Sequence, residues 1–490
     1  MITKEHIPLE VRIIAETLEN AGFEAYLVGG CVRDILLNKT PKDWDITTNA
    51  HPEDIEKTFE NTFINNDFGT VGVVNEETED ASLKVVEVTP YRSESGYSDS
   101  RRPDEVTFGV SLDDDLTRRD FTVNAIAYRV KDNTLVDPFD GQKDIKDKKL
   151  RAVGEATLRF EEDALRMMRA VRLAVEHDFT IEAETMAAIV QNAANLERIS
   201  KERIRDEFIR IINSAQPMQG IVFLEKLSLL PYVLPEIAEG IGIDQNQAHA
   251  YDVYEHNLRS LQHAADKDYP FEIRLAALLH DIGKPATREH SEEKRDWTFY
   301  NHEVVGAKMA KTILKDLKFP RETIETVTKL VRWHMFFSDP DQVTLSAVRR
   351  TIRNVGEDQI WNLLNLRICD RIGTGRPKEQ PFRFRKYKSM VEEALRDPIS
   401  VKMLKMDGGK IMEITGEKPS PKLGNILHAL LEEVLDDPQK NTDDYLTQRV
   451  KELSGMPEEE LRALGEKGKE KQAETEAQEI KKIRRKNKVY

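Results

Sequence analysis

Residues 29–48 read GGCVRDILLNKTPKDWDITT and bring two glycines, an arginine and two closely spaced aspartates together. The apolar run before the glycines predicts a buried strand that ends in a tight turn. A short stretch with helical spacing follows the turn, and residues 43–48 predict a second strand. Because alternate side chains of a strand point to the same face, we expect Asp43 and Asp45 to point together toward the turn.

These residue types suit a phosphorylated ligand and divalent cations. Two carboxylates on one face offer the oxygen ligands that Mg²⁺ prefers, and Glu87 is the best candidate for a third on a neighbouring strand. A turn formed by Gly29 and Gly30 at the start of a helix presents N–H groups to phosphate, and Arg33 adds further donors. The pattern predicts a nucleoside-triphosphate site joined to a two-metal phosphoryl-transfer site. The alternative is a polar strand edge after a glycine turn.

The composition limits the class of protein. The chain has 490 residues, 39% hydrophobic and 33% charged, so we expect three or four domains of a soluble, helix-rich protein. No apolar run is long enough to span a membrane, and the start lacks the apolar core of a secretion signal. The two cysteines, Cys31 and Cys369, exclude a disulfide framework and favour the cytoplasm. The net charge of -15 argues against bulk coating of nucleic acid, although local basic patches can still grip a folded RNA.

The chain divides into an α/β head and an all-α body, so the expected fold class is α+β. Strand signals lie near 25–30, 43–48, 71–74, 83–89 and 134–137, and amphipathic helices follow from about residue 155. The expected domains are a head at 1–150, a helical neck at 151–248, a histidine-bearing domain at 249–376, a helical tail at 377–455 and a charged, flexible C-terminus at 456–490.

Histidines and aspartates in the second half form a candidate metal site. His256, His280, Asp281 and Asp370 follow the order H…HD…D on segments with helical spacing. Imidazole and carboxylate together suit Mn²⁺, Fe²⁺, Co²⁺, Ni²⁺ or Mg²⁺ better than a thiolate-rich zinc site does. Lys284 is near enough along the chain to contact a phosphate. The alternative is a set of packed or solvated histidines without a metal.

Asp163 and Arg166 could distinguish bases without a template. They are three residues apart in a helical pattern, so we expect them on one face. Cytosine and adenine each present an amino donor beside a ring-nitrogen acceptor, whereas uracil and guanine present the reverse. Because aspartate accepts and arginine only donates, the pair matches C and A. Arg169 and Arg172 continue the same face and would hold the triphosphate. The alternative is an ordinary surface ion pair.

Three motifs together resemble the class II tRNA nucleotidyltransferase and bacterial poly(A) polymerase family. They are the run at 29–48, RRDFTVNAIAY at 118–128 and EEDALRMMRAVRLA at 161–174. The resemblance implies a polymerase-β-like nucleotidyltransferase head, then a helical neck, body and tail. It implies that Asp43 and Asp45 bind Mg²⁺ and that Asp120 is placed for a ribose hydroxyl. The implied nucleotide-binding set is Gly29, Gly30, Arg33, Arg119, Asp120, Asn124, Asp163, Arg166, Arg169 and Arg172.

The segment AALLHDIGKP at 276–285 resembles the HD phosphohydrolase superfamily. His302 and His334 fit the extra histidines of some members, so these two and Lys284 are candidates for a second metal or a phosphate contact. The resemblance implies a divalent transition metal or Mg²⁺ in this domain. It also suggests phosphatase or 2′,3′-cyclic phosphodiesterase chemistry that would repair damaged tRNA ends.

The function expected is addition of C, C and A to tRNA from CTP and ATP. Residues 67–74 resemble the G-T-V segment of CCA-adding members, and residues 95–104 could be the flexible loop that lets the pocket change from C to A. The alternatives are a poly(A) polymerase, a CC-only or A-only enzyme, or an HD phosphohydrolase with a vestigial RNA-binding head. The oligomeric state stays open.

The tail sequence at 406–435 resembles the segment that holds the tRNA elbow in HD-bearing members of the family. Backbone N–H groups and lysine charges position RNA without reading its sequence. The candidate contacts are Gly408, Gly409, Lys410, Lys418 and Lys422. The alternative is a helix-packing turn with solvated lysines.

Overall fold

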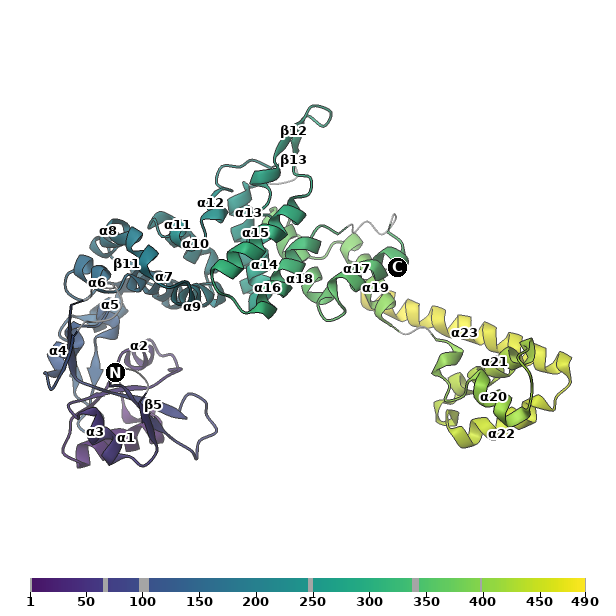
Figure 1. The fold of residues 1–490 in the computed structure, drawn as a ribbon, viewed down its shortest axis with the longest axis horizontal. Coiled ribbons are helices and arrows are strands. Elements are labelled where there is room, and N and C mark those ends of the chain that lie inside the picture. Colours follow the sequence, from purple (N-terminus) through teal and green to yellow (C-terminus); the bar gives the residue numbers. More distant parts are fainter. Residues whose placement is uncertain are drawn as a thin grey trace. The chain divides into compact units, whose positions relative to one another are not determined.

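The computed structural model describes residues 2–64, 69–96, 105–245, 250–336, 343–396 and 399–489. They form two compact units (Figure 1). Unit 1 comprises Met1–His334 and Asn365–Pro377, and unit 2 comprises Met335–Leu364 and Lys378–Tyr490. In the described parts of the chain, no helix is long and apolar enough to cross a membrane.

A seven-stranded sheet forms the head of unit 1, and the sequence predicted five of its strands but not those at Thr62–Ile64 and Ala127–Tyr128. In sheet order the strands are β3 (Thr62–Ile64), β4 (Val71–Val74), β5 (Val85–Pro90), β2 (Asp45–Thr48), β1 (Ala25–Val28), β8 (Ala127–Tyr128) and β9 (Leu135–Val136). The strands β2 and β5 run parallel, and their register sets Asp45 opposite Glu87. All four side chains of β1 are buried, which explains why this apolar run lies inside the sheet.

The second aspartate starts β2, but the first does not belong to the strand. Asp43 lies in a bend two residues before β2 begins, so the expectation that both aspartates share one strand is wrong. Pro41 and the polar residues around it do not continue the pairing, because proline has no N–H for a ladder. Asp43 therefore reaches the site from a loop.

The head also carries short helices and a hairpin. The helices are α1 (Leu9–Asn20), α2 (Gly30–Leu36), α3 (Pro52–Thr58), α4 (Leu112–Thr117) and α5 (Gly141–Lys146), and the hairpin consists of β6 (Arg92–Ser95) and β7 (Glu105–Phe108). The loop expected to permit the change from C to A falls at the tip of this hairpin, where residues 97–104 lie outside the described residues.

The rest of unit 1 is almost entirely helical. The neck contains α6 (Ala156–Glu162), α7 (Leu165–His177), α8 (Ala183–Asn192), α9 (Lys201–Asn213), α10 (Pro217–Lys226), α11 (Leu230–Val233) and α12 (Pro235–Ala238). The histidine-bearing part contains α13 (Val253–Asp266), α14 (Phe271–Leu279), α15 (His302–Asp316), α16 (Arg321–Trp333), most of α18 (Ile360–Gly373) and a hairpin of β12 (Glu289–Ser291) and β13 (Asp296–Thr298). Seven of the nine residues of α14 are buried, so this helix forms the centre of its bundle.

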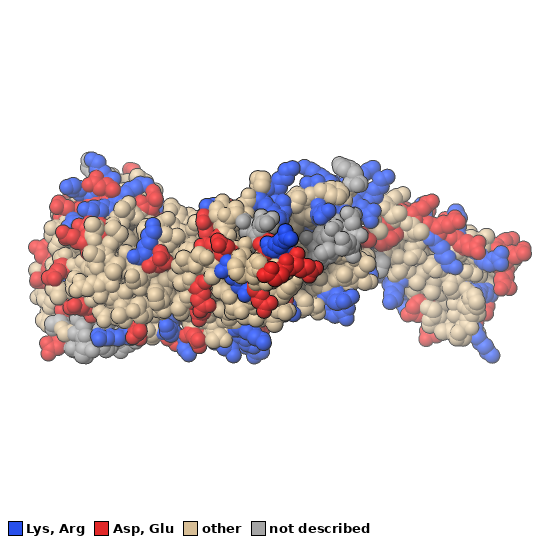
Figure 2. Space-filling model, turned by 90° about the horizontal axis from the view of Figure 1, so that it is seen from above, with Lys and Arg blue, Asp and Glu red and all other residues tan. Residues whose placement is uncertain are grey.

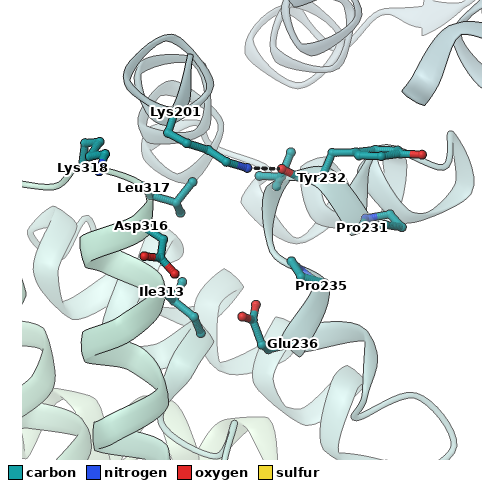
Figure 3. A pocket seen from close by; sticks show the side chains of 10 residues that line it. Lys201, Pro231, Tyr232, Pro235, Glu236, Ile313, Asp316, Leu317 and Lys318 are labelled. Atoms are coloured by element: carbon teal, nitrogen blue, oxygen red, sulfur yellow. Dashed lines mark hydrogen bonds between the residues drawn. The ribbon is translucent and has the colours of Figure 1, made fainter. Parts of the chain in front are cut away.

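An open pocket of about 420 Å³ separates the neck from the end of α15. Figure 3 shows Lys201 of α9 reaching across to the Tyr232 carbonyl, with the Lys201 Nζ donating at 3.1 Å. Asp316 and Glu236 extend toward the same space from α15 and α12. Lys201 and Tyr232 both belong to the neck. Arg274 of α14 joins the two helical parts of unit 1, because its Nη1 donates to the carbonyls of Asn213 and Ser214 at 3.2 Å.

Unit 2 has its own core. Its helices are α17 (Leu345–Val355), α19 (Phe382–Leu395), α20 (Gly408–Thr415), α21 (Pro421–Asp436), α22 (Asp443–Ser454) and α23 (Glu458–Lys486). Ile426 and Leu430 of α21, Leu446 of α22 and Leu461 of α23 are fully buried in one cluster. The helix α17 belongs to unit 2, where it packs on α19.

The C-terminal segment is a helix and not the flexible chain that its charge suggested. The helix α23 runs for 29 residues and packs along α21. Two glycines make this contact close. A Cβ added at Gly468 would lie 2.0 Å from the His428 carbonyl oxygen, and one at Gly465 would lie 2.8 Å from Asn425. The helix α23 therefore packs on α21 through a narrow stripe of small residues and not through a wide apolar face.

Candidate active site and metal centre

The turn between β1 and α2 lets charged side chains approach the backbone. Gly29 has a φ of +79°, a region that favours glycine, and a Cβ there would lie 3.3 Å from Arg119 Nη1 and 3.5 Å from Asp45 Oδ2. A Cβ added at Gly30 would lie 3.6 Å from Arg33 Nη2 and 3.8 Å from Asp43 Oδ1. The predicted glycines, arginines and aspartates therefore surround one turn at a helix start.

Three carboxylates repel one another at this turn. Burial, and then the charges of Asp43 and Glu87, raise the pKa of Asp45 to about 7. Arg119 and Arg169 oppose that shift but do not cancel it. A cation would neutralise the charges that raise the pKa of Asp45, and oxygen donors are the ligands that Mg²⁺ prefers. The residues present fit a divalent cation.

A hydrogen-bond network links the head to the neck through the predicted residues. Arg33 Nη1 donates to Asn124 Oδ1 at 2.8 Å, and Asn124 Nδ2 donates to Asp120 Oδ1 at 3.0 Å. Arg169 of α7 donates from Nε to Asp120 Oδ2 at 2.8 Å. Although burial favours the neutral acid, Arg169 holds the pKa of Asp120 well below its usual range. Asp34 Oδ1 accepts hydrogen bonds from the Nε and Nη2 atoms of Arg33.

One residue of this site was not foreseen. Asp115 of α4 is fully buried, and its Oδ2 accepts from Arg119 Nη2 at 3.1 Å, while its Oδ1 accepts from Arg118 Nη2 at 2.7 Å. Thr47 of β2 donates to the same carboxylate at 3.2 Å. Asp115 thus fixes the arginine that overlies Gly29. In the sequence Asp115 stands in the acidic run DDDL at 113–116. Nothing in that run distinguishes it from the exposed Asp113 and Asp114.

Asp163 and Arg166 do not share a helix face. Asp163 has extended backbone between α6 and α7, and its Oδ1 accepts from Leu165 N at 3.0 Å at the start of α7. Aspartate favours such helix-start positions over helix interiors, so a spacing of three residues does not put Asp163 and Arg166 on one face. Asp163 pairs instead with Arg203 of α9 at 2.8 Å, and Arg166 pairs with Glu162 at 2.6 Å. Arg203 carried no local sequence signal, because it lies forty residues further along.

The two arginines that follow in α7 also differ in setting. Arg169 keeps 37% of its side chain exposed beside Asp120, close to the glycine turn. Arg172 is 3% exposed and pairs with Glu207 at 2.6 Å and Glu176 at 3.2 Å. Arg169 is therefore available to a ligand, whereas Arg172 holds α7 against α9.

The second site gathers four buried histidines and two aspartates. His256 Nε2 lies 2.9 Å from His280 Nε2 and 3.1 Å from Asp281 Oδ2. Asp370 Oδ1 lies 3.5 Å from His256 Nε2. On the other side of the same aspartate, Asp281 Oδ1 lies 3.2 Å from His302 Nε2 and 3.5 Å from His334 Nε2. The sequence predicted four of these residues as metal ligands and His302 and His334 as candidates for a second metal or a phosphate contact. The structure places all six side chains together.

Backbone carbonyls fix how three of these imidazoles face the centre. The Nδ1 atoms of His280, His302 and His334 donate to the carbonyls of Ala277, Phe299 and Val331 at 2.9, 2.7 and 2.7 Å. A proton on Nδ1 leaves Nε2 as an acceptor, which is the state of a metal-binding histidine. Burial lowers the pKa of His334 to about 4, so it stays neutral at pH 7.

The donors form two groups that could each hold an ion. One consists of His256, His280 and Asp370, and the other of Asp281, His302 and His334; in each group the donor atoms lie within 4.8 Å of one another. Because Asp281 presents one oxygen to each group, it is placed to bridge two ions. The Nε2 acceptors of His302 and His334 lie 3.2 Å apart, which fits a cation between them, so the donor set suits divalent metals.

Lys284 closes the same centre. Its Nζ lies 2.6 Å from Asp281 Oδ2 and donates to Gln245 Oε1 at 2.5 Å. His280 and Lys284 together hold the pKa of Asp281 well below its usual range despite complete burial. Gln245 was not predicted, because it precedes the histidine motif and is one polar residue in an irregular segment.

Glycines let the elements that carry the ligands approach closely. A Cβ added at Gly283 would lie 2.4 Å from the His302 carbonyl oxygen, and one at Gly373 would lie 2.8 Å from the His256 carbonyl oxygen. These contacts bring the start of α15 against the turn that carries His280 and Asp281, called the HD turn below. They also bring α18 against α13. The ligands therefore depend on helix packing over more than 100 residues of sequence.

Family models match three segments of the chain. A poly A polymerase head domain matches residues 25–151, a probable RNA and SrmB binding site of polymerase A matches residues 178–241, and an HD domain matches residues 253–373. These segments contain the glycine turn, the neck helices and the histidine centre. The polymerase-β-like head and the helical body expected from the sequence are confirmed.

Relatives extend over nearly the whole chain. A CCA-adding enzyme of Levilactobacillus brevis is 34% identical over 91% of this chain and 99% of its own length. The Bacillus stearothermophilus CCA-adding enzyme, solved in complex with CTP, is 26% identical with a TM-score of 0.60, covering 91% of this chain and 98% of that one. A Thermotoga maritima CCA-adding enzyme complexed with tRNA has the same fold at 18% identity and a TM-score of 0.51, covering 92% and 97%. The chain belongs to the family of CCA-adding enzymes and is a nucleotidyltransferase.

Proposed function

We propose that this chain adds C, C and A to the 3′ end of tRNA, using CTP and ATP and no nucleic-acid template. One observation carries the proposal: three carboxylates meet a glycine turn and two arginines in the head. The tRNA 3′-hydroxyl would attack the α-phosphate and release pyrophosphate. Mg²⁺ bound at this site would lower the pKa of the hydroxyl and balance the charge of the leaving group.

The residues around the turn divide the work. Asp43 and Asp45 would hold the Mg²⁺ ions, and Glu87 would orient the attacking group beside Asp45. The N–H groups after Gly29 and Gly30 and the guanidinium of Arg33 would bind the triphosphate. Arg119, Asp120 and Asn124 would contact the nucleotide, with Asp120 facing a ribose hydroxyl, and Arg169 would add positive charge from the neck while Arg172 holds α7 in place.

Asp163 and Arg166 remain the proposed readers of the base edge, and their present partners explain how they could be held ready. Each is paired to one charged group, Arg203 or Glu162, that a base edge could replace. A bidentate base contact contributes about 1–3 kcal/mol of discrimination. Asp163→Ala should therefore reduce the preference for CTP over UTP by about tenfold or more, while Arg205→Ala, a neighbouring arginine of α9, should leave it unchanged.

The reaction can be tested with tRNA that lacks its last three nucleotides. With CTP alone the product should gain two nucleotides, and with CTP and ATP it should gain three. A long ladder with ATP alone would indicate a poly(A) polymerase, and a stop after two residues in the presence of both would indicate a CC-only enzyme. Asp43→Asn with Asp45→Asn should abolish incorporation, and unchanged incorporation would refute the assignment of the metal ligands.

We propose a second activity for the histidine centre, a metal-dependent phosphohydrolase that removes phosphate or opens a cyclic phosphate at RNA 3′ ends. The bridging position of Asp281 between two donor groups supports it. Wild-type protein loaded with Mn²⁺ should hold two ions, and His334→Ala should hold one. Release of phosphate from RNA with a 3′-phosphate, and hydrolysis of a 2′,3′-cyclic end to a terminal phosphomonoester, should fall in the variant, while nucleotide addition should not change. Two ions in both proteins would contradict the bridged arrangement.

A further inference from the structure

The hairpin of β12 and β13 connects two parts of the histidine centre. It begins after Lys284, whose Nζ lies 2.6 Å from Asp281. It ends at Phe299, whose carbonyl accepts from His302 Nδ1 at 2.7 Å. The Lys284 Nζ also lies 5.5 Å from the centre of the Phe299 ring. The base of the hairpin therefore lies against the metal centre, while its strands project from the helices (Figure 1).

One face of the hairpin carries Arg288, His290 and Trp297, called the hairpin stripe below. His290 and Trp297 are partners in the register, and their rings meet edge to face with centroids 5.2 Å apart. The guanidinium carbon of Arg288 lies over the indole, 3.8 Å from the centre of the Trp297 ring. Because alternate residues of a strand share a face, Phe299 continues the side of Trp297 toward Lys284. The hairpin stripe therefore leads to the metal centre.

Arg288 keeps donors that the described residues do not use. Its Nε is buried and has no hydrogen-bond partner there, and no carboxylate of the described residues pairs with the guanidinium. A second arginine, Arg332, lies over Trp333 at 4.8 Å, but it pairs with Glu303 at 3.6 Å. Because Arg288 is held over a ring without a carboxylate, it can donate to a ligand without breaking an ion pair.

The charges of the centre favour a phosphate at the end of the stripe. Lys284 lies beside one carboxylate of the centre, that of Asp281. Arg367 pairs with the other, that of Asp370, while 30% of the arginine side chain stays exposed. Each carboxylate thus has a cation next to it before any metal binds. Divalent cations in the two donor groups would add positive charge that a phosphate can neutralise.

The tip of the hairpin carries both signs of charge. Glu292, Glu293, Lys294 and Arg295 are all exposed there. In Figure 2, which looks down onto the hairpin, acidic and basic side chains lie next to one another in the middle of the view. A surface of mixed sign does not attract a polyanion by net charge. The aromatic ring and the unpaired guanidinium, and not an excess of cations, therefore distinguish this hairpin.

We infer that the hairpin stripe is a base-binding subsite of the histidine centre, so the substrate class of that centre is a nucleoside phosphate. The base lies against Trp297 and Arg288, and the phosphate faces the metal donors. The inference rests on the proposed phosphohydrolase activity. In that reaction the oxygen of water bonds to phosphorus, one ester P–O bond breaks, and a proton of the water passes to the released ribose oxygen.

The test compares a substrate that has a base with one that lacks it, using the full chain loaded with Mn²⁺. The two are adenosine 2′,3′-cyclic phosphate and glycerol 1,2-cyclic phosphate. Trp297→Leu should raise KM for the nucleotide about tenfold, because base stacking is lost, and leave its kcat unchanged. The KM for the glycerol compound should stay the same. Trp297→Tyr, which keeps a ring, should restore most of the affinity, and Arg288→Gln should raise KM for the nucleotide alone.

Binding without turnover gives a second readout. The 3′-phosphonomethyl analogue of adenosine 3′-phosphate has a C–P bond in place of the ester and cannot be hydrolysed. With CTP saturating the head, this analogue should quench the indole fluorescence, and Trp297→Phe should remove most of the quenching. Each variant should bind as many Mn²⁺ ions as the wild-type protein, which excludes a collapse of the metal centre.

The matched control is Arg295→Gln, which removes an exposed cation from the tip of the same hairpin and should change none of these values. Equal effects of Arg295→Gln and Arg288→Gln, or a rise in KM for both cyclic phosphates, would overturn the subsite. Quenching that depends on Trp297 without hydrolysis of any substrate would defeat only the phosphohydrolase. Hydrolysis that is insensitive to Trp297 would defeat only the subsite. An RNA with a 2′,3′-cyclic end is the second source of the same chemistry, and dependence on Trp297 with either substrate supports the inference.

Discussion

Among single residues, Asp45 links the electrostatics of the head most directly to activity. Its pKa is raised to about 7 by burial and by the carboxylates of Asp43 and Glu87. A cation must therefore compete with a proton at physiological pH. Because metal ligands bind in the deprotonated form, the Mg²⁺ concentration for half-maximal nucleotide addition should rise about fivefold from pH 7 to pH 6 and change little above pH 8.

The control for this pH dependence is Glu87→Gln, which removes one neighbouring charge. The pKa of Asp45 should then fall toward its ordinary value, so the residual activity should need less additional Mg²⁺ at pH 6 than wild-type activity does. The measurement is nucleotide incorporation against Mg²⁺ concentration at each pH. An identical dependence in both proteins would show that Asp45 is not the group that titrates.

At the residue scale, local patterns predicted which side chains carry chemistry better than they predicted geometry. Asp45 and Glu87 face each other because β2 and β5 pair in register, which agrees with the expectation of a third carboxylate on a neighbouring strand. Asp163 was placed wrongly, because a helical spacing of three does not reveal that α6 ends before Asp163 and that α7 begins only at Leu165. Its partner Arg203 depends on the packing of α9, which no short motif records.

At the scale of elements, Gly283 determines how closely the HD turn approaches α15. A Cβ there would lie 2.4 Å from the His302 carbonyl and 2.6 Å from Gly306 N, and both neighbours are backbone. Gly283→Ala should cost about 1–3 kcal/mol of unfolding free energy and displace His302 from Asp281. Mn²⁺ binding should weaken while nucleotide addition persists. Gly424→Ala, in α21 with open space around it, should be neutral or stabilising in the same thermal and metal-binding assays.

The contact between α21 and α23 gives a second prediction for elements. In Gly468→Ala the new methyl would collide with the His428 carbonyl, so α23 should separate from α21. Limited proteolysis should then cut the lysines of α23 much faster than in wild type, and the core of unit 2 should lose about 1–3 kcal/mol. Equally fast cleavage of the wild-type protein would support the flexible C-terminus expected from composition.

The sequence contained a signal for this helix, but a weak one. Leu461, Gly465 and Gly468 follow the spacing of one helix face, and all three are buried. The segment is highly charged and has no wide apolar stripe. Because patterns of apolar residues dominate the prediction of helices, these three small or apolar residues did not predict one. Small residues stabilise such a helix only through a close partner, and the partner α21 lies elsewhere in the sequence.

For the whole molecule, motif order predicted unit 1 but not the division of the chain. The motifs of the head, neck and histidine centre occur in sequence and fold together. The helix α17 belongs to unit 2, whereas the end of α18, which carries Asp370, belongs to unit 1. The amino-acid composition does not predict this division. One ligand of the metal centre therefore depends on a segment that begins in the other unit.

This division predicts how metal should affect stability. Unit 1 contains every candidate ligand, and unit 2 has a separate core, so Mn²⁺ should raise the unfolding temperature of the first and not of the second. A ligand at one hundred times its dissociation constant stabilises the folded state by about 2.7 kcal/mol, enough to shift unit 1 by a few degrees. Calorimetry should show the shift in wild type and lose it in His280→Ala with His302→Ala. In Asp43→Asn with Asp45→Asn, which leaves the histidine centre intact, most of the shift should remain. A shift of both transitions, or of neither, would mean that the two units do not unfold independently or that the histidines hold no metal.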